Sequence, residues 1–224
     1  MTTSEFLANE IKQASQQQNQ VLERRLIWDL PLRVGHWLLV VCFAGAWLTS
    51  ESEYFAQLHL LFGYSVLAFL VFRLFWGFAG SRYARWSSFI FSREEIWNYM
   101  KSPFKAASKT YFGHNPLGSV GIFLMLISLF FMVGTGLSLD LLTSDHWLSE
   151  IHEVFAELLL VLIFVHIAGV VLTGWLHHQA LVPAMFHGKK LSVPLGQQIP
   201  HHYLWGLIVL FAVVSVSFYY ALSR

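Results

Sequence analysis

Two histidines on one hydrophobic segment have a spacing that suits paired metal ligands. His152 and His166 stand fourteen residues apart. Fourteen steps of an α-helix return to within about 40° of the starting face and advance about 21 Å, most of the thickness of a bilayer's hydrocarbon core. His36 and His59 lie at the starts of two other hydrophobic segments. One helix therefore offers imidazole nitrogens at two depths, and two further helices offer a partner for each.

The composition identifies an integral membrane protein. Of the 224 residues, 56% are hydrophobic and only 12% charged, with a mean hydropathy of +0.55, which excludes an ordinary water-soluble domain. Five segments are long and apolar enough to span a bilayer. These predicted helices cover about Leu32–Thr49, Leu58–Phe78, Leu117–Leu139, Ile151–Leu176 and Tyr203–Ala221. We therefore expect an all-α bundle surrounded by membrane lipid.

Basic residues predict the orientation of the bundle. Lys and Arg precede the first helix and fill the connections between the second and third and between the fourth and fifth helices. The connections at 50–57 and 140–150 contain neither. Because Lys and Arg beside spans are retained in the cytoplasm, we expect a cytoplasmic N-terminus and a periplasmic C-terminus. These bases abut membrane spans, so no nucleic-acid surface is predicted.

Depth predicts which histidines form pairs. The first helix enters from the cytoplasm and places His36 near that side, whereas the second enters from outside and places His59 near the other. The fourth helix also enters from outside, which gives His152 the outer depth and His166 the inner one. His36 can therefore pair with His166, and His59 with His152.

Two neutral imidazoles in an apolar bundle suit the two axial positions of a haem iron. Filling both positions leaves no site for oxygen or substrate, which favours electron transfer over ligand chemistry. Zinc fits less well, because a closed zinc site needs four ligands. We predict two b haems, one near each face. There is no C-x-x-C-H motif and Cys42 is the single cysteine, so the haems are not covalently attached.

Arg73 lies fourteen residues beyond His59, near the depth of the inner pair. A haem carries propionate carboxylates, which an arginine fork binds well. Arg73 is therefore a candidate cofactor-binding residue, although a guanidinium that snorkels to the cytoplasmic surface would explain it equally well. Arg33, Arg82 and Arg85 are weaker candidates.

Other functions remain open from the residues alone. The histidines, together with Glu157 on the fourth helix, could form a relay in a metal-ion or proton transporter without haem. Glu157 could equally hydrogen-bond inside the bundle, which we slightly favour. A purely structural membrane subunit would need none of the four histidines. The remaining histidines lie in predicted loops or at helix ends, where surface positions are expected: His114, His146, His177, His178, His187, His201 and His202.

The chain divides into three expected parts. Residues 1–26 are polar and lack the apolar stretch of a cleavable signal peptide, so they are interpreted as a cytoplasmic tail. Residues 27–190 form the four-helix domain, and residues 191–224 form a linker and the fifth helix. Between the second and third helices, Ser92 and Glu95 predict a capping box at the start of a short surface helix that Pro103 would end.

The sequence resembles the bacterial cytochrome b561 and nickel-iron hydrogenase b-type cytochrome family over about residues 27 to 190. The likeness is carried by Trp28–Trp37 (WDLPLRVGHW), His59 with Gly63 and Tyr64, Phe72–Arg85 (FRLFWGFAGSRYAR) and Gly113–Gly118 (GHNPLG). The family's four-helix core holds two b haems with ligands on its first, second and fourth helices. On this chain, the resemblance assigns these roles to His36, His59, His152 and His166.

The resemblance implies a respiratory role in a bacterial inner membrane. Such a protein exchanges electrons between the quinone pool and a partner, commonly a hydrogenase or a c-type cytochrome at the outer face. It would be an electron-transfer subunit with quinone as its redox substrate. The Asn115-Pro116 turn explains the Gly113–Gly118 motif structurally, although His114 could serve at a quinone site there.

Overall fold

The computed structural model describes residues 23–101, 111–142, 145–191, 193–194 and 196–223, and it contains five helices long and apolar enough to cross a membrane. These helices confirm the predicted all-α class and its five spans, within a few residues at most ends. The fourth span begins five residues earlier than expected. The five are α2 (Leu30–Thr49), α3 (Ala56–Ala79), α5 (Pro116–Leu141), α6 (His146–Leu176) and α8 (Trp205–Leu222).

Side-chain caps fix where two of the spans begin. The Asp29 carboxylate accepts a hydrogen bond from the Leu32 amide at 2.9 Å at the start of α2, and Pro31 occupies its first turn. The Asn115 side chain accepts from the Gly118 amide at 2.6 Å at the start of α5, where Pro116 is the first helical residue. Both caps satisfy amides that the helix itself leaves unpaired. The register of His36 on α2 is thereby set.

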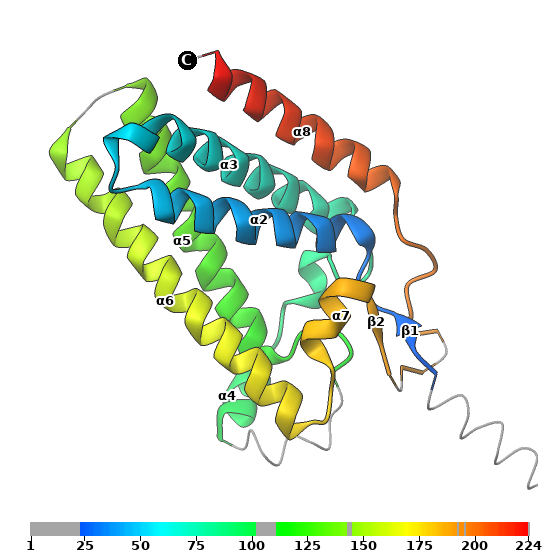
Figure 1. Cartoon of the computed structure of the whole chain (residues 1–224). Coiled ribbons are helices and arrows are strands. Elements are labelled where there is room, and N and C mark those ends of the chain that lie inside the picture. Colours follow the sequence, from blue (N-terminus) through cyan, green and yellow to red (C-terminus); the bar gives the residue numbers. More distant parts are fainter. Residues whose placement is uncertain (1–22, 102–110, 143–144, 192, 195, 224) are drawn as a thin grey trace, which may run out of the picture.

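The four core helices form two hairpins. α2 packs along α3, and α5 packs along α6, while α3 makes the main contact between the two hairpins through α5 (Figure 1). An apolar cluster joins all four helices near their middles. It consists of Phe43 on α2, Val66, Phe69 and Leu70 on α3, Leu129, Met132 and Val133 on α5, and Leu159 on α6. α6 packs chiefly on α5, and it is the least buried of the five spans.

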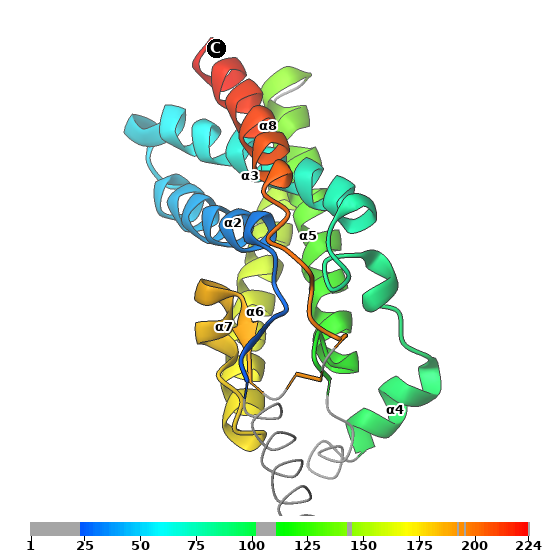
Figure 2. The ribbon, with the colours of Figure 1, turned by 90° about the vertical axis from the view of Figure 1, so that its right-hand side faces the viewer.

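The two ends of the bundle differ in construction. We call the end with the short connections, through the 3-10 helix Glu53–Phe55 and residues 142–145, the turn end. We call the other end, which carries the Lys-rich and Arg-rich connections, the basic end. The basic end holds the short helices α4 (Arg93–Lys101) and α7 (Leu181–His187), and Figure 2 shows them on opposite sides of the bundle. A second 3-10 helix, Trp86–Ser88, also lies in these connections.

A backbone clasp closes the basic end. Strand β1 (Arg25–Leu26) pairs antiparallel with β2 (Lys189–Lys190). The amides of Ile27 and Trp28 both donate to the Gly188 carbonyl, at 2.8 and 3.0 Å. Gly188 has a φ of 79°, a left-handed conformation that favours glycine. The segment before α2 is thus fixed to the connection between α6 and α8.

The fifth span covers the first hairpin. α8 packs on α3 and, less extensively, on α2 (Figure 1). Its Gly206 lies against the indole of Trp76, which is fully buried and donates from Nε1 to the Asp29 carboxylate at 3.1 Å. Asp29 also accepts a hydrogen bond from the Ser81 hydroxyl. α8 therefore docks on a tryptophan that is hydrogen-bonded to the carboxylate capping α2.

Two sequence predictions concern the connections. The capping box is confirmed: the Glu95 amide donates to the Ser92 hydroxyl at 3.1 Å, and the Ser92 amide donates to the Glu95 carboxylate at 3.3 Å. α4 follows, while Pro103 and most of the predicted N-terminal tail lie outside the described residues. Trp28, whose place just before the first span is typical of an interfacial anchor, is instead buried in the core of the basic end.

Candidate cofactor site

His59 and His152 meet at the turn end of the bundle. His59 lies in the first turn of α3 and His152 in the second turn of α6. Their ring centroids are 6.3 Å apart, with an interplanar angle of 74°. The structure thus brings this predicted pair together, although the two residues are far apart in sequence.

Backbone carbonyls orient both of these rings. His59 donates from Nδ1 to the Ala46 carbonyl at 2.9 Å, and His152 donates from Nδ1 to the Met132 carbonyl at 2.8 Å. A carbonyl only accepts, so each Nδ1 carries the proton and each Nε2 has a lone pair. Metal-binding histidines are held in this way, with one ring nitrogen hydrogen-bonded and the other on the metal.

The separation of these rings suits a shared metal ion. With metal–nitrogen bonds of about 2.0 Å, and ring centres about 1.1 Å behind each nitrogen, two opposed imidazoles have centroids about 6.2 Å apart. The observed separation is 6.3 Å. The residues at the turn end therefore fit a bis-histidine iron.

His36 and His166 occupy the basic half of the bundle. His36 lies in the second turn of α2, and His166 lies fourteen residues beyond His152 on α6. The two imidazoles interact electrostatically. Nδ1 of His36 is shielded from solvent and has no hydrogen-bond partner. The α2 and α6 helices make little direct contact, so direct packing of these two helices does not hold the two histidines together.

The apolar cluster separates the two histidine levels. Phe43 is seven residues beyond His36, Val66 is seven beyond His59, and Leu159 is midway between the two histidines of α6. All three are buried members of the cluster. Seven residues are two helical turns, about 10 Å, so the cluster lies between the two pairs and keeps their surroundings dry.

Arg73 lies in the basic half and faces inward. Its side chain is 4% exposed, and its guanidinium carbon lies 4.2 Å from the centroid of the Trp86 ring and 5.2 Å from that of Phe89. Nη1 of Arg73 is buried without a hydrogen-bond partner. The snorkelling alternative is wrong, because the guanidinium remains inside the fold.

The unpaired polar atoms of the fold gather at one level. Among the described residues, four buried side-chain atoms lack a hydrogen-bond partner: His36 Nδ1, Arg73 Nη1, His114 Nδ1 and Ser119 Oγ. All four come from the basic half of the bundle. Buried polar groups are normally paired, so a cluster of exceptions calls for an explanation such as a bound group. These residues fit the polar edge of a haem.

The surroundings of His114 were not predicted from the sequence, which indicated a surface histidine or, alternatively, a residue of a quinone site. Its ring stacks on Phe89 at 4.3 Å between centroids and lies 4.8 Å from the Trp28 ring. Burial, together with the nearby charges of Lys190 and Arg73, lowers the pKa of His114 to about 3. The aromatic neighbours are distant in sequence, so no local pattern reveals this environment. His146, by contrast, is exposed and pairs with Glu150 at 3.2 Å, as a surface histidine should.

The structure places Glu157, the acidic residue of the alternative relay, away from the interior of the bundle. Glu157 is exposed on α6, so its expected hydrogen bond inside the bundle is wrong. No group of three or more His, Cys, Asp or Glu side chains is placed to hold a metal ion in the part of the chain that the structure describes. The site instead consists of imidazole pairs in apolar surroundings.

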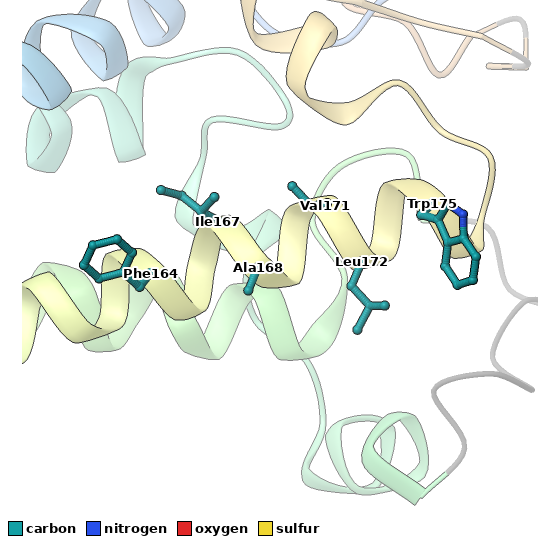
Figure 3. A pocket seen from close by; sticks show the side chains of 6 residues that line it. All are labelled: Phe164, Ile167, Ala168, Val171, Leu172 and Trp175. Atoms are coloured by element: carbon teal, nitrogen blue, oxygen red, sulfur yellow. The ribbon is translucent and has the colours of Figure 1, made fainter.

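The basic half of α6 presents an open apolar hollow. Its lining comes from this one helix: Phe164, Ile167, Ala168, Val171, Leu172 and Trp175 (Figure 3). These residues flank His166 on both sides in sequence. An apolar molecule could approach this part of α6 from the membrane without crossing a polar barrier.

The fold defines a helical membrane protein in which histidines of different spans face one another at the turn end. A family model described as prokaryotic cytochrome b561 matches residues 27–188. The chain belongs to this family, and it is a b-type cytochrome that carries electrons in a membrane.

Curated relatives agree with this assignment. A "Probable Ni/Fe-hydrogenase B-type cytochrome subunit" of Rhizobium leguminosarum bv. viciae is 25% identical over 85% of this chain and 98% of its own length. A protein of the same name from Azotobacter vinelandii is 24% identical over 74% of this chain and 88% of its own. The "Probable Ni/Fe-hydrogenase 1 B-type cytochrome subunit" of Escherichia coli strain K12 is 25% identical over 55% and 63%. No solved structure matches significantly.

Proposed function

We propose that the protein binds two b haems through paired histidines and conducts electrons between the two faces of a bacterial inner membrane. His59 and His152 hold the haem at the turn end, and His36 and His166 hold the one at the basic end. The observation that carries this proposal is the 6.3 Å separation of the His59 and His152 rings, each tethered through Nδ1.

In this proposal the chain's residues bind the haems, orient their histidine ligands and keep water away from them. When bound, each haem supplies an iron that alternates between ferric and ferrous states and so carries one electron. Two histidines on each iron leave no position for oxygen or substrate, which suits electron transfer. The Ala46 and Met132 carbonyls hold the turn-end imidazoles in one tautomer. The apolar cluster around Leu159 excludes water between the two levels.

Arg73 is the proposed partner of a propionate at the basic end. Its buried guanidinium is stacked on Trp86, with Nη1 unpaired. A planar guanidinium so held can donate two parallel hydrogen bonds to a carboxylate. Arg82 and Arg85 are exposed and are less suited to this role.

The electron donors and acceptors are proposed from the relatives. Their names associate them with nickel-iron hydrogenases, and we propose that this chain exchanges electrons between membrane quinone and a hydrogenase or a c-type cytochrome. The basic end would face the cytoplasm and the turn end the periplasm, because Lys and Arg beside spans stay inside. Residues 27–190 would form the haem domain, residues 1–26 a cytoplasmic tail, and residues 191–224 a linker with the fifth span.

Single histidine replacements test the pairing. His59→Ala and His152→Ala should each remove the same haem, and His36→Ala and His166→Ala should each remove the other, because an iron cannot keep six coordination with one protein ligand gone. Haem per protein and redox titration of the purified full chain measure this. The wild type should contain two six-coordinate b haems.

His146→Ala is the matched control, because His146 lies six residues before His152 on the same helix and is exposed. It should retain both haems. If His59→Ala and His152→Ala removed different haems, or if the wild type contained no haem, the proposed ligation would be wrong.

A further inference from the structure

Three basic side chains from separate segments of the chain converge in the basic half of the bundle. Arg73 comes from α3, His114 from the segment before α5, and Lys190 from β2. His114 interacts electrostatically with Lys190, Arg73 and His166. Residues more than a hundred positions apart in the chain thus surround one spot beside the proposed ligand His166.

Lys190 reaches this spot from the clasp. Its Nζ donates to the Gly113 carbonyl at 3.4 Å and lies 5.5 Å from the centroid of the Trp28 ring. Burial lowers the pKa of Lys190 to about 8, so the amine is still mainly cationic at neutral pH. The β1 and β2 pairing holds the residue in place, with Arg25 opposite Lys190.

Aromatic rings border the spot. Phe89 stacks on His114 and Trp28 packs against it at a tilt, while Trp86 and Phe89 lie near the Arg73 guanidinium. His114 is neutral near pH 7, since its pKa lies far below that value. It therefore offers a hydrogen-bonding nitrogen without a third charge, and Nδ1 is shielded and unpaired.

The two cations of this spot form no close ion pair. The salt bridges of the described residues do not include Arg73 or Lys190. Asp29 acts on Arg73 electrostatically, but its carboxylate already accepts hydrogen bonds from Leu32, Trp76 and Ser81. Holding two like charges partly or fully out of water without an anion between them is costly. Anionic oxygens between them would satisfy the unpaired Nη1 of Arg73 and Nδ1 of His114 together.

We propose that Lys190 and His114, together with Arg73, form a seat, that is, a binding site, for the carboxylates of the basic-end haem. This inference rests on the proposed function. A haem propionate is favoured over a free anion because the seat adjoins His166 and is bordered by the aromatic rings of Trp28, Trp86 and Phe89. The haem would thereby bind β2 and the 111–115 segment to α3, so the clasp becomes part of the cofactor site.

Redox titration of the purified full-length cytochrome tests the seat. Lys190→Met and Arg73→Gln each remove a positive charge that favours the ferrous state. At the wild-type midpoint potential of the basic-end haem, the ferrous-to-ferric ratio should fall about tenfold, equivalent to 59 mV for one electron. The turn-end haem should not respond.

Arg85→Gln is the matched control. Arg85 is an exposed arginine in the connection that follows α3, and its Nε donates to the Gly80 carbonyl. Its replacement should leave both midpoints unchanged. An equal shift in Arg85→Gln would show that only general surface charge acts, and it would overturn the seat.

A vibrational measurement separates a propionate contact from an indirect effect on folding. The resonance Raman band for propionate bending should move in Lys190→Met and in His114→Phe, while the bis-histidine coordination bands stay in place. An unchanged propionate band in both variants would overturn the inference. So would a wild-type midpoint that shifts on addition of inorganic phosphate, because a free anion would then occupy the seat.

These outcomes are distinguishable from failure of the proposed function. A wild type with two bis-histidine haems whose potentials ignore Arg73 and Lys190 would overturn the seat alone. A wild type without haem would overturn the ligation itself.

Discussion

Main-chain carbonyl groups determine which ring nitrogen carries the proton in the two turn-end imidazoles. His59 and His152 each donate from Nδ1 to a main-chain carbonyl, those of Ala46 and Met132. A neutral acceptor orients the ring without adding charge, whereas a carboxylate acceptor would make the imidazole more basic and favour ferric iron. The haem that we propose at the turn end should therefore respond to changes in ring position more than to changes in nearby charge.

Gly136 leaves room for the imidazole ring of His152. A Cβ at Gly136 would lie 2.9 Å from Cε1 of His152, too close for an unshifted ring. Gly136→Ala should push the imidazole off its acceptor and reduce turn-end haem occupancy about 10-fold or more, the scale of second-shell losses at metal sites. Haem content and the six-coordinate spectrum measure the effect.

Gly134→Ala provides the control two residues away on α5. A Cβ there meets nothing within 4 Å, so the variant gains only helix propensity, and both haems should remain. Equal haem loss in the two variants would show that any alanine in this part of α5 disturbs the site, and not the contact with His152 in particular. Full occupancy in Gly136→Ala would mean that His152 does not hold the iron in this position.

Sequence reasoning identified residues whose position along a helix determines their role. The pairing of His59 with His152 followed from depth alone, and the structure brings these rings together. It did not place His114 or Lys190 beside the inner histidine pair, because their surroundings are created by contacts with Trp28 and Phe89 across the fold. Glu157 was predicted to face the inside of the bundle but is exposed. Hydropathy gives the depth of a residue in the membrane, but it does not show which side of the helix packs against its neighbours.

At the scale of elements, hydropathy predicted the long helices and local patterns predicted the capping box, whereas the clasp was not foreseen. β1 and β2 have two residues each and pair across more than 160 positions. α7 is a seven-residue helix whose place is set by contacts with α2: Trp37 donates from Nε1 to the Met185 carbonyl and stacks on Phe186 at 4.5 Å. Such short elements carry too little periodicity to be predicted.

The docking of α8 depends on a small residue at one crossing point. A Cβ at Gly206 would overlap the Trp76 ring, which is pinned to Asp29 and cannot move aside freely. Gly206→Ala should destabilise the protein by about 1–3 kcal/mol, as overpacking does. Thermal denaturation followed by tryptophan fluorescence measures this. Because the imidazole pairs lie on α2, α3 and α6, both haems should stay bound below the transition.

Gly121→Ala on α5 is the matched variant, since a Cβ there meets nothing within 4 Å. Its stability should equal or slightly exceed that of the wild type, because alanine is the better helix former. If Gly206→Ala unfolded at the wild-type temperature, α8 would not be docked through Trp76.

At the scale of the whole molecule, α8 determines which surfaces remain open. It covers α3 and part of α2, so the second hairpin keeps its outer face, including the apolar hollow on α6 (Figure 3). The family match ends at residue 188, before α8 begins. A quinone or a partner helix that used the α6 face would therefore meet the same surface whether or not a fifth span is present.

Charge asymmetry predicts how this molecule lies in the membrane. The basic end carries the clasp and α4, while the connections at 50–55 and 142–145 contain neither Lys nor Arg. Translocating the basic end would move many cations across the bilayer, so it should stay in the cytoplasm. Alkaline phosphatase, which is active only outside the cytoplasm, should be active when fused after Leu141 or Ser223 and inactive after Lys101 or Gly188. The reverse pattern would invert the proposed orientation and place the Arg73, His114 and Lys190 seat at the periplasmic face, without altering the histidine pairs themselves.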